Sequence, residues 1–174
     1  QEVDVVIVGL GAAGGVLLKE LASAGLDVVG IEAGPYWNPQ IDFASDELHA
    51  RTLAWNDTRL STGKNALQFG SNNSGRGVGG GTVHFTGVFY RFHESDFQVR
   101  TLDGVAEDWP IRYEDLAPYY SKVEQDIKVS GPREFPWGAF RGPYPYPERD
   151  PISANAQIFR KGCEALGIRS TVAP

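Results

Sequence analysis

The sequence predicts an α/β fold that begins with a Rossmann-like βαβ unit over residues 3–32. Three observations carry this prediction: an apolar, β-branched run at 3–8, a glycine-rich turn at 9–14, and a second apolar run at 27–31 that ends in an acid. The first run is interrupted only by Asp4, a pattern typical of a strand buried on both faces of a parallel sheet.

The turn after the first run indicates a bound nucleotide. Gly9, Gly11 and Gly14 have the G-x-G-x-x-G spacing, in which glycine allows a tight turn, close approach of a pyrophosphate, and close packing of helix on strand. Ala12 and Ala13 would open a helix whose free N–H groups and positive dipole end point at that pyrophosphate. The turn therefore predicts a dinucleotide site, although a Rossmann-like unit that has lost its ligand would show the same glycines.

The second apolar run ends in Glu32, which is followed by Ala33 and by the turn residues Gly34 and Pro35. A carboxylate at this point can accept hydrogen bonds from the adenosine ribose hydroxyls, and it disfavours a ribose that carries a 2′-phosphate. We therefore expect Glu32 and Ala33 to contact the adenosine part of the dinucleotide. The helix between the two runs is expected to stop at Gly25.

Composition and charge exclude several other classes. The 174 residues suffice for one domain with a real core, and the net charge of −6 without a basic run argues against nucleic acid as a partner. A single cysteine excludes an internal disulfide, and the three histidines lack metal-ligand spacing, so we expect no metal. No apolar run approaches the roughly 20 residues of a membrane span. The abrupt start without methionine predicts a trimmed N-terminus, which leaves a removed targeting segment open.

A second glycine-rich stretch lies at 75–87 and has six glycines among thirteen residues. Such a density excludes the interior of a stable helix or strand, and it is typical of a backbone that passes close to a flat or bulky group. A flexible surface loop is the alternative, but the apolar and aromatic residues at 83–90 argue against simple exposure. We predict that the loop contacts a cofactor through Arg76, Gly79, Gly80, Gly81, Thr82 and His84.

The βα alternation is lost between these two stretches. Residues 36–73 mix aromatic and polar residues around an amphipathic segment at 46–55, which we interpret as an excursion covering a large cofactor. We assign residues 1–92 to a cofactor-binding part and 93–174 to the start of a substrate-side part.

The spacing of apolar residues and the positions of capping, glycine and proline residues predict the elements of this second part. We expect a helix start at 93–97 capped by Ser95 or Asp96, a helix at 114–128 stopped by Gly131, and a helix at 153–166. Residues 168–172 are expected to start a strand whose partners are not in this sequence. Residues Leu116, Tyr120, Val123 and Ile127 should form the apolar face of the 114–128 helix. The stretch 132–151, rich in proline and aromatic residues, is predicted as a loop that lines the substrate entrance or meets another subunit.

Three motifs together resemble one protein family. They are Glu-Ala-Gly-Pro at 32–35, Arg-Gly-Val-Gly-Gly-Gly-Thr at 76–82, and Asp-Trp-Pro-Ile-Arg-Tyr-Glu-Asp-Leu-Ala-Pro-Tyr-Tyr at 108–120. Over nearly the whole chain the sequence is similar to the N-terminal portion of the glucose-methanol-choline family of flavoprotein oxidoreductases. The resemblance implies that the dinucleotide is FAD.

Within this family, the stretch 78–85 resembles the sugar and polyol dehydrogenases (gluconate, fructose, sorbitol and FAD-dependent glucose dehydrogenases) and pyranose oxidase. Their pattern is G-G-x-[ST]-x-H-[WF], and Phe85 stands where the alcohol-oxidase branches more often have Asn. The resemblance implies oxidation of a CH–OH group of a sugar or polyol by hydride transfer to the flavin. In several such members the histidine that corresponds to His84 is bonded to the 8α-methyl carbon of FAD, and non-covalent packing against the flavin is the open alternative.

The family's catalytic histidine lies far beyond the position of Pro174, so we assign no catalytic residue in this chain. The chain is expected to be a fragment, inactive alone, whose partner is the missing C-terminal half of the same enzyme. Three hypotheses stay open: a dehydrogenase that passes electrons to a cytochrome or quinone, an oxidase that uses oxygen, and an inactive nucleotide-binding module. The dehydrogenase hypothesis implies the bacterial periplasm or membrane periphery, and otherwise we expect the cytoplasm.

Overall fold

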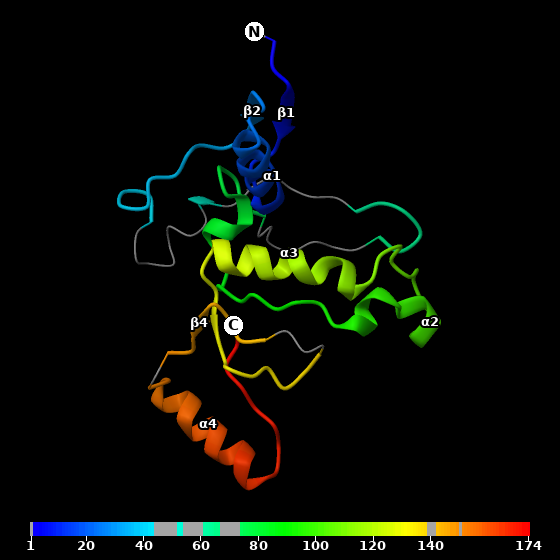
Figure 1. The fold of residues 1–174 in the computed structure, drawn as a ribbon, viewed down its shortest axis with the longest axis vertical. Helices are drawn as coiled ribbons and strands as arrows, with labels where there is room; N and C mark the ends of the chain where they lie inside the picture. Colours follow the sequence, from blue (N-terminus) through cyan, green and yellow to red (C-terminus); the bar gives the residue numbers. More distant parts are fainter. Residues whose placement is uncertain (1, 44–51, 54–60, 67–73, 139–141, 150) are drawn as a thin grey trace. The chain divides into compact units, whose positions relative to one another are not determined.

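A computed structural model describes residues 2–43, 52–53, 61–66, 74–138, 142–149 and 151–174 (Figure 1). The chain divides into two compact units, residues 1–87 and 88–174. The amphipathic segment noted at 46–55 lies almost wholly outside the described residues.

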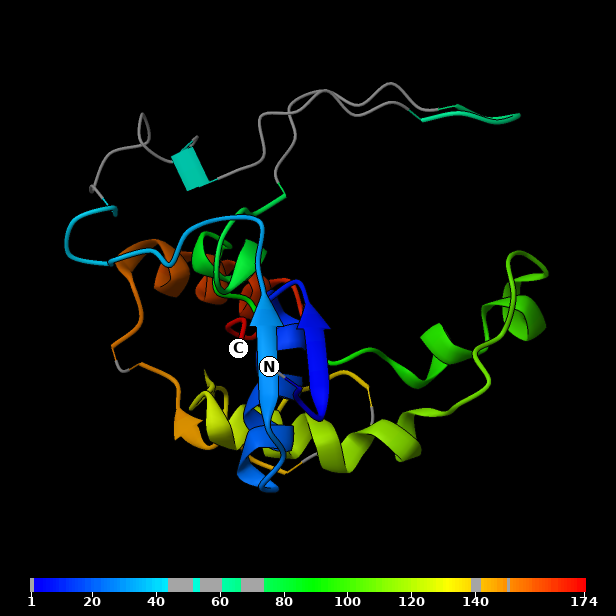
Figure 2. The ribbon, with the colours of Figure 1, turned by 90° about the horizontal axis from the view of Figure 1, so that it is seen from above.

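The first unit contains the predicted βαβ unit. Strand β1 (Val5–Val8) leads into helix α1 (Ala12–Ser23), which returns to strand β2 (Val28–Ile31). The two strands run parallel and side by side, with Val5 opposite Val28 and Val8 opposite Ile31 (Figure 2). Gly25 directly follows the end of α1 with a φ of +90°, as expected of a residue that stops a helix. The predicted α/β unit is therefore confirmed, with strands shorter than expected at their N-terminal ends.

The predicted burial of the first strand on both faces is wrong for this chain. Ile7 is 7% exposed and lies toward α1, whereas Val6 is 52% and Val8 82% exposed. Successive side chains of a strand point to opposite faces, and within the described residues α1 covers only the face that carries Ile7. The second face of the sheet is thus apolar but uncovered.

The glycine-rich stretch at 75–87 is more regular than its composition predicts. It includes a 3-10 helix, η2, over Gly80–Val83. Gly79 and Gly80 precede and open this turn with φ values of +95° and +54°, which favour glycine. A single 3-10 turn of four residues is compatible with the expectation that this stretch forms no stable helix interior.

In the second unit, the predicted helix starts and ends are shifted. The elements are η3 (Glu94–Phe97), α2 (Val99–Asp103), α3 (Tyr113–Asp126), β3 (Ser130–Gly131), β4 (Tyr146–Pro147) and α4 (Ala154–Ala165). His93, rather than Ser95 or Asp96, is the N-cap of η3, and Asp96 Oδ2 accepts a hydrogen bond from His93 N at 2.7 Å. Helix α3 ends before Gly131, which pairs instead with Pro147 in a short parallel bridge between β3 and β4.

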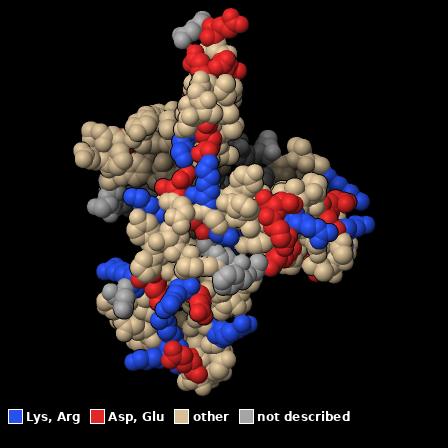
Figure 3. Space-filling model, viewed as in Figure 1, with Lys and Arg blue, Asp and Glu red and all other residues tan. Residues whose placement is uncertain are grey.

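The C-terminal segment confirms one prediction and corrects another. Helix α4 begins after Ser153, whose Oγ accepts a hydrogen bond from Ala156 N at 3.3 Å, as its sequence predicts. Residues 168–172 form no strand, because no described segment pairs with them. Figure 3 shows basic side chains mixed with acidic ones over α4, and this helix also exposes Ile158 and Phe159.

A buried ion pair holds the start of the second unit to α3. Arg91 Nε and Nη2 donate to the two carboxylate oxygens of Glu124 at 2.9 and 2.8 Å, and both side chains are 8% exposed. Arg91 Nη1 also donates to Tyr113 Oη at 3.1 Å, and the guanidinium lies 5.4 Å from the centre of the Tyr120 ring. Burial alone would lower the pKa of Arg91, but its bonds to Glu124 and Tyr113 outweigh burial and raise that pKa.

This ion pair sets the buried face of α3. Tyr113 and Glu124 are the buried residues of the helix, whereas Val123 is 36% and Ile127 47% exposed. The predicted face of Leu116, Tyr120, Val123 and Ile127 is therefore wrong in its C-terminal half, where Val123 and Ile127 are exposed, whereas Leu116 and Tyr120 are half-buried. A charged residue is buried here because its partner comes from a distant segment, which the periodicity of apolar residues does not reveal.

Candidate cofactor site

The turn after β1 has the geometry expected of its first and third glycines. Gly9 has a φ of +90°, and its N–H donates to Ile31 O at 2.7 Å, which joins the end of β1 to the end of β2. A Cβ at Gly14 would lie 1.9 Å from Gly9 O, so any side chain there would push α1 away from the strand. These two glycines are required by the backbone itself.

The second glycine of the turn is different. Gly11 is the N-cap of α1, and a Cβ built on it meets no atom within 4 Å. No acidic residue lies in the first turn of this 12-residue helix, and Ala12 and Ala13 are exposed. The helix N-terminus is therefore open and suited to an anionic group.

Glu32 joins the turns that follow the two strands. Its Oε2 accepts from Leu10 N at 2.8 Å, and its Oε1 accepts from Gly34 N at 3.0 Å. The hydrogen bond from the backbone of Leu10, together with those from Gly34, Gly77 and Ala33, outweighs desolvation and lowers the pKa of this carboxyl below its ordinary value of 4.5. The bonds from Leu10 and Gly34 use one lone pair on each carboxylate oxygen, and the backbone N–H groups of Gly77 and Ala33 also act on this carboxylate.

The second glycine stretch packs against the first. Gly79 N donates to Leu10 O at 2.7 Å, and a Cβ on Gly80 would lie 3.0 Å from Gly11 Cα. A Cβ on Gly34 would lie 2.4 Å from Gly77 N, and Val78 N donates to Pro35 O at 3.0 Å. Two stretches that are about seventy residues apart in the sequence thus form one surface of the first unit.

Two predicted contacts have structural roles within this loop. The carbonyl of Arg76 accepts from Trp37 Nε1 at 2.8 Å, and Arg76 N donates to Leu53 O at 2.9 Å. The Thr82 hydroxyl donates to Gly79 O, across the 3-10 turn. The sequence analysis did not predict a role for Trp37, which lies two residues after the Glu-Ala-Gly-Pro turn at 32–35.

His84 follows η2 and carries an unusual nitrogen. Its Nε2 is buried and has no hydrogen-bond partner among the described residues, while its backbone N donates to Gly81 O at 3.3 Å. Buried polar atoms are nearly always hydrogen-bonded, and an exception requires a specific explanation. A bound group beside the loop would provide one. Gly81 and Ala33 are exposed and leave room on the same unit.

The described residues contain no group of three or more side chains suited to hold a metal ion. Among the helices described, none combines the length and apolar character that a bilayer crossing needs.

A parallel βαβ unit whose glycine turn opens onto a helix N-terminus defines a nucleotide-binding α/β protein. No protein-family model matches the chain. It is 32% identical to 6‴-hydroxyparomomycin C oxidase of Streptomyces lividus over 98% of the chain and 31% of that protein. It is 28% identical to the fructose dehydrogenase large subunit of Gluconobacter japonicus over 98% of the chain and 36% of that protein.

Among solved structures, pyridoxine 4-oxidase from Mesorbium loti matches with a TM-score of 0.55 and 25% identity, over 95% of this chain and 32% of that one. The chain thus spans about a third of the length of these proteins. They are oxidoreductases of the glucose-methanol-choline type, which confirms the resemblance that the three sequence motifs predicted. Members of this family are FAD flavoproteins.

The residues present fit such a cofactor. The open N-terminus of α1, the free space at Gly11 and the unpartnered His84 Nε2 lie in the same compact unit. The individual contacts of Gly9, Gly11, Glu32 and the 76–84 loop with FAD stay predictions.

Adjacent glycines in α1 allow a matched test of the turn. We expect Gly14→Ala to lower the free energy of unfolding by about 1–3 kcal/mol, because the added Cβ has no room beside Gly9 O. Gly15→Ala is the control: its Cβ meets nothing within 4 Å, and alanine favours a helix interior by roughly 0.5–1 kcal/mol. Denaturant unfolding of the intact protein measures both, and equal effects would contradict the close packing.

The pKa of Glu32 predicts a pH-dependent stability. Because its folded pKa lies below 4.5, its stabilising contribution is complete above that pH and is lost as the pH falls through the folded value. The thermal midpoint of Glu32→Gln should therefore lie below that of the unchanged protein near neutral pH, and the gap should narrow below pH 4.5. A gap that widens toward acid would show that the carboxylate does not hold the two turns.

Proposed function

We propose that this chain supplies the FAD-binding part of an enzyme that oxidises a CH–OH group of a sugar or polyol by hydride transfer to the flavin. The observation that carries this proposal is the packing of the two glycine stretches against each other beside a buried, unpartnered histidine nitrogen. The similarity to a fructose dehydrogenase subunit and to an oxidase of an aminoglycoside supports a sugar or polyol as substrate.

The first glycine turn is assigned to the pyrophosphate. The N–H groups of the first turn of α1 would donate to its oxygens, and Gly11 would leave space for them because it lacks a side chain. Glu32 would accept from the ribose hydroxyls at its two carboxylate oxygens, each of which already accepts one backbone N–H. Ala33 would lie beside the adenosine.

The second glycine stretch is assigned to the flavin. Gly79, Gly80, Gly81 and Thr82 would bring the backbone close to the ring system, and His84 would contact it through Nε2. Bound FAD supplies the acceptor for the two electrons of the alcohol. We place the proton-accepting catalytic base in the remainder of the enzyme, since no residue of this chain is assigned to that role.

The fate of the electrons defines two alternatives. We favour a dehydrogenase that delivers them to a cytochrome or quinone, at the bacterial periplasm or membrane periphery. An oxidase that delivers them to oxygen is the second candidate, because two of the similar proteins are named as oxidases.

Anaerobic reduction tests the proposed reaction. Glucose, gluconate or sorbitol is added under nitrogen to the intact FAD-loaded enzyme. At least one of the three should reduce the flavin and bleach its visible absorbance. An artificial acceptor should restore the colour in either case, and rapid recovery in air would identify the oxidase. If flavin that binds normally is bleached by no sugar or polyol, the proposed substrate class is wrong.

The linkage at His84 is tested by acid precipitation. If Nε2 is bonded to the flavin, the yellow colour of the unchanged protein should remain with the acid precipitate. The flavin of the His84→Ala variant should instead pass into the supernatant. His93→Ala is the control, because it removes a histidine outside the glycine-rich stretch at 75–87 and should leave a bond to His84 intact. Complete release of flavin from the unchanged protein would exclude the covalent bond and leave packing against the flavin as the role of His84.

A further inference from the structure

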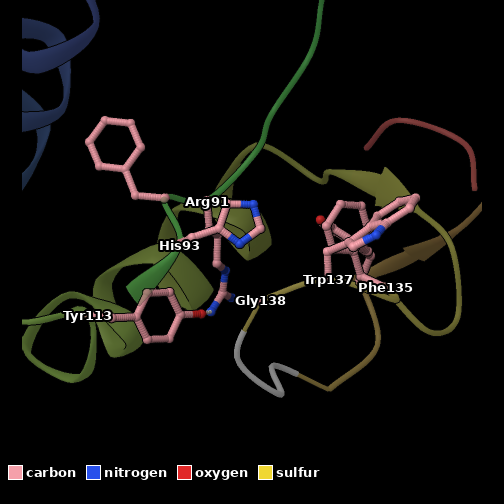
Figure 4. Close-up of a pocket in the computed structure, with 8 residues that line it drawn as sticks. Arg91, His93, Tyr113, Phe135, Trp137 and Gly138 are labelled. Carbon is pink, nitrogen blue, oxygen red and sulfur yellow. Dashed lines mark hydrogen bonds between the residues drawn. The ribbon is translucent and has the colours of Figure 1, made fainter. Parts of the chain in front are cut away.

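The second unit contains a shallow hollow that the proposed function does not use. Figure 4 shows the side chains around it, which include Arg91, His93, Tyr113, Phe135, Trp137 and Tyr144. Its enclosed part measures about 20 Å³, which is room for about one water molecule or one oxygen substituent. A ligand can therefore insert a single small group and must lay the rest of its body across the rim.

Aromatic rings form one side of this rim. Phe135 and Trp137 meet edge to face, with centroids 5.6 Å apart and planes at 74°, and Tyr90 lies 5.9 Å from Phe135. Trp137 remains 38% exposed, so part of its indole is free to take a further ring. Such ring pairs are favourable beyond the area they bury.

The hollow carries little net charge. Arg91 is its cationic group, and it directs four hydrogen bonds to Glu124, Tyr113 and Ser121. Because Glu124 neutralises the guanidinium at 2.8 Å, an anionic ligand would gain no unpaired positive charge from Arg91. The lining thus favours a neutral ligand.

His93 provides the main polar contact at the rim. Gly138, with a φ of +76°, brings its backbone against the imidazole, so that a Cβ there would lie 3.0 Å from His93 Nδ1. Imidazole nitrogens donate or accept according to tautomer. The Tyr113 hydroxyl accepts from Arg91 and keeps its own proton to donate.

We propose that this hollow binds a neutral aromatic ring that carries one oxygen substituent. The oxygen would enter the enclosed part beside His93, and the ring would stack on Trp137 and Phe135. A sugar ring fits the site less well, because each of its hydroxyls needs a partner and most polar groups of the lining are already bonded within the protein.

The test uses 4-fluorophenol, which is neutral near pH 7 and has no CH–OH group to oxidise. Titration of the intact enzyme followed by fluorine NMR should show saturable binding. Trp137→Ala and His93→Ala should each raise the dissociation constant about threefold to tenfold. Trp137→Phe should restore most of the affinity, and Tyr119→Ala, an aromatic residue that is 66% exposed on α3 and outside the lining, should leave it unchanged.

Three results would overturn the proposal: no saturable binding, equal affinities in all variants, or displacement of the phenol by methyl glucoside at matched concentration. Tighter binding of 4-fluorobenzoate than of 4-fluorophenol would refute the neutral character of the site. The titration detects binding alone, so its outcome is independent of whether the enzyme oxidises a sugar.

Discussion

The carboxylate of Glu32 is the contact on which the first unit depends. It stands at the end of β2 and accepts one backbone N–H from the turn after β1 and one from the turn after β2. Both donors belong to loops that would otherwise leave amide groups without a partner. The acid that the sequence assigns to a ribose is therefore also a structural residue, because it fixes the positions of the loops that surround the proposed nucleotide.

Around this carboxylate, close backbone contacts decide where glycine is needed. Gly14, Gly34 and Gly77 have no space for a Cβ, whereas Gly11 does. The same residue type thus serves packing at some positions and leaves free space at another. The fold therefore requires glycine at positions 14, 34 and 77, whereas at position 11 only a bound ligand would require it.

The sequence was sufficient for the features that depend on neighbouring residues. The βαβ unit follows from two apolar runs and a glycine turn, and the N-cap of α4 follows from Ser153 alone. The sequence was insufficient to predict contacts between residues that are far apart along the chain. Arg91 and Glu124 are 33 positions apart, so their pairing and the rotated face of α3 have no local signal. The segment at 168–172, whose strand partners were expected outside this sequence, forms no strand for a related reason, because a strand forms only when a partner is beside it.

The Leu10 peptide shows how much of the candidate site is fixed by the protein alone. Its N–H is held by Glu32, and its carbonyl is held by Gly79. With both sides of this residue bonded, contacts within the protein fix the turn that faces the proposed pyrophosphate. A cofactor that meets such a surface loses little affinity to the ordering of loops, since preorganisation removes that entropic cost of association. The glycine-rich stretch at 75–87 therefore stabilises the turn after β1 in addition to its proposed contact with the flavin.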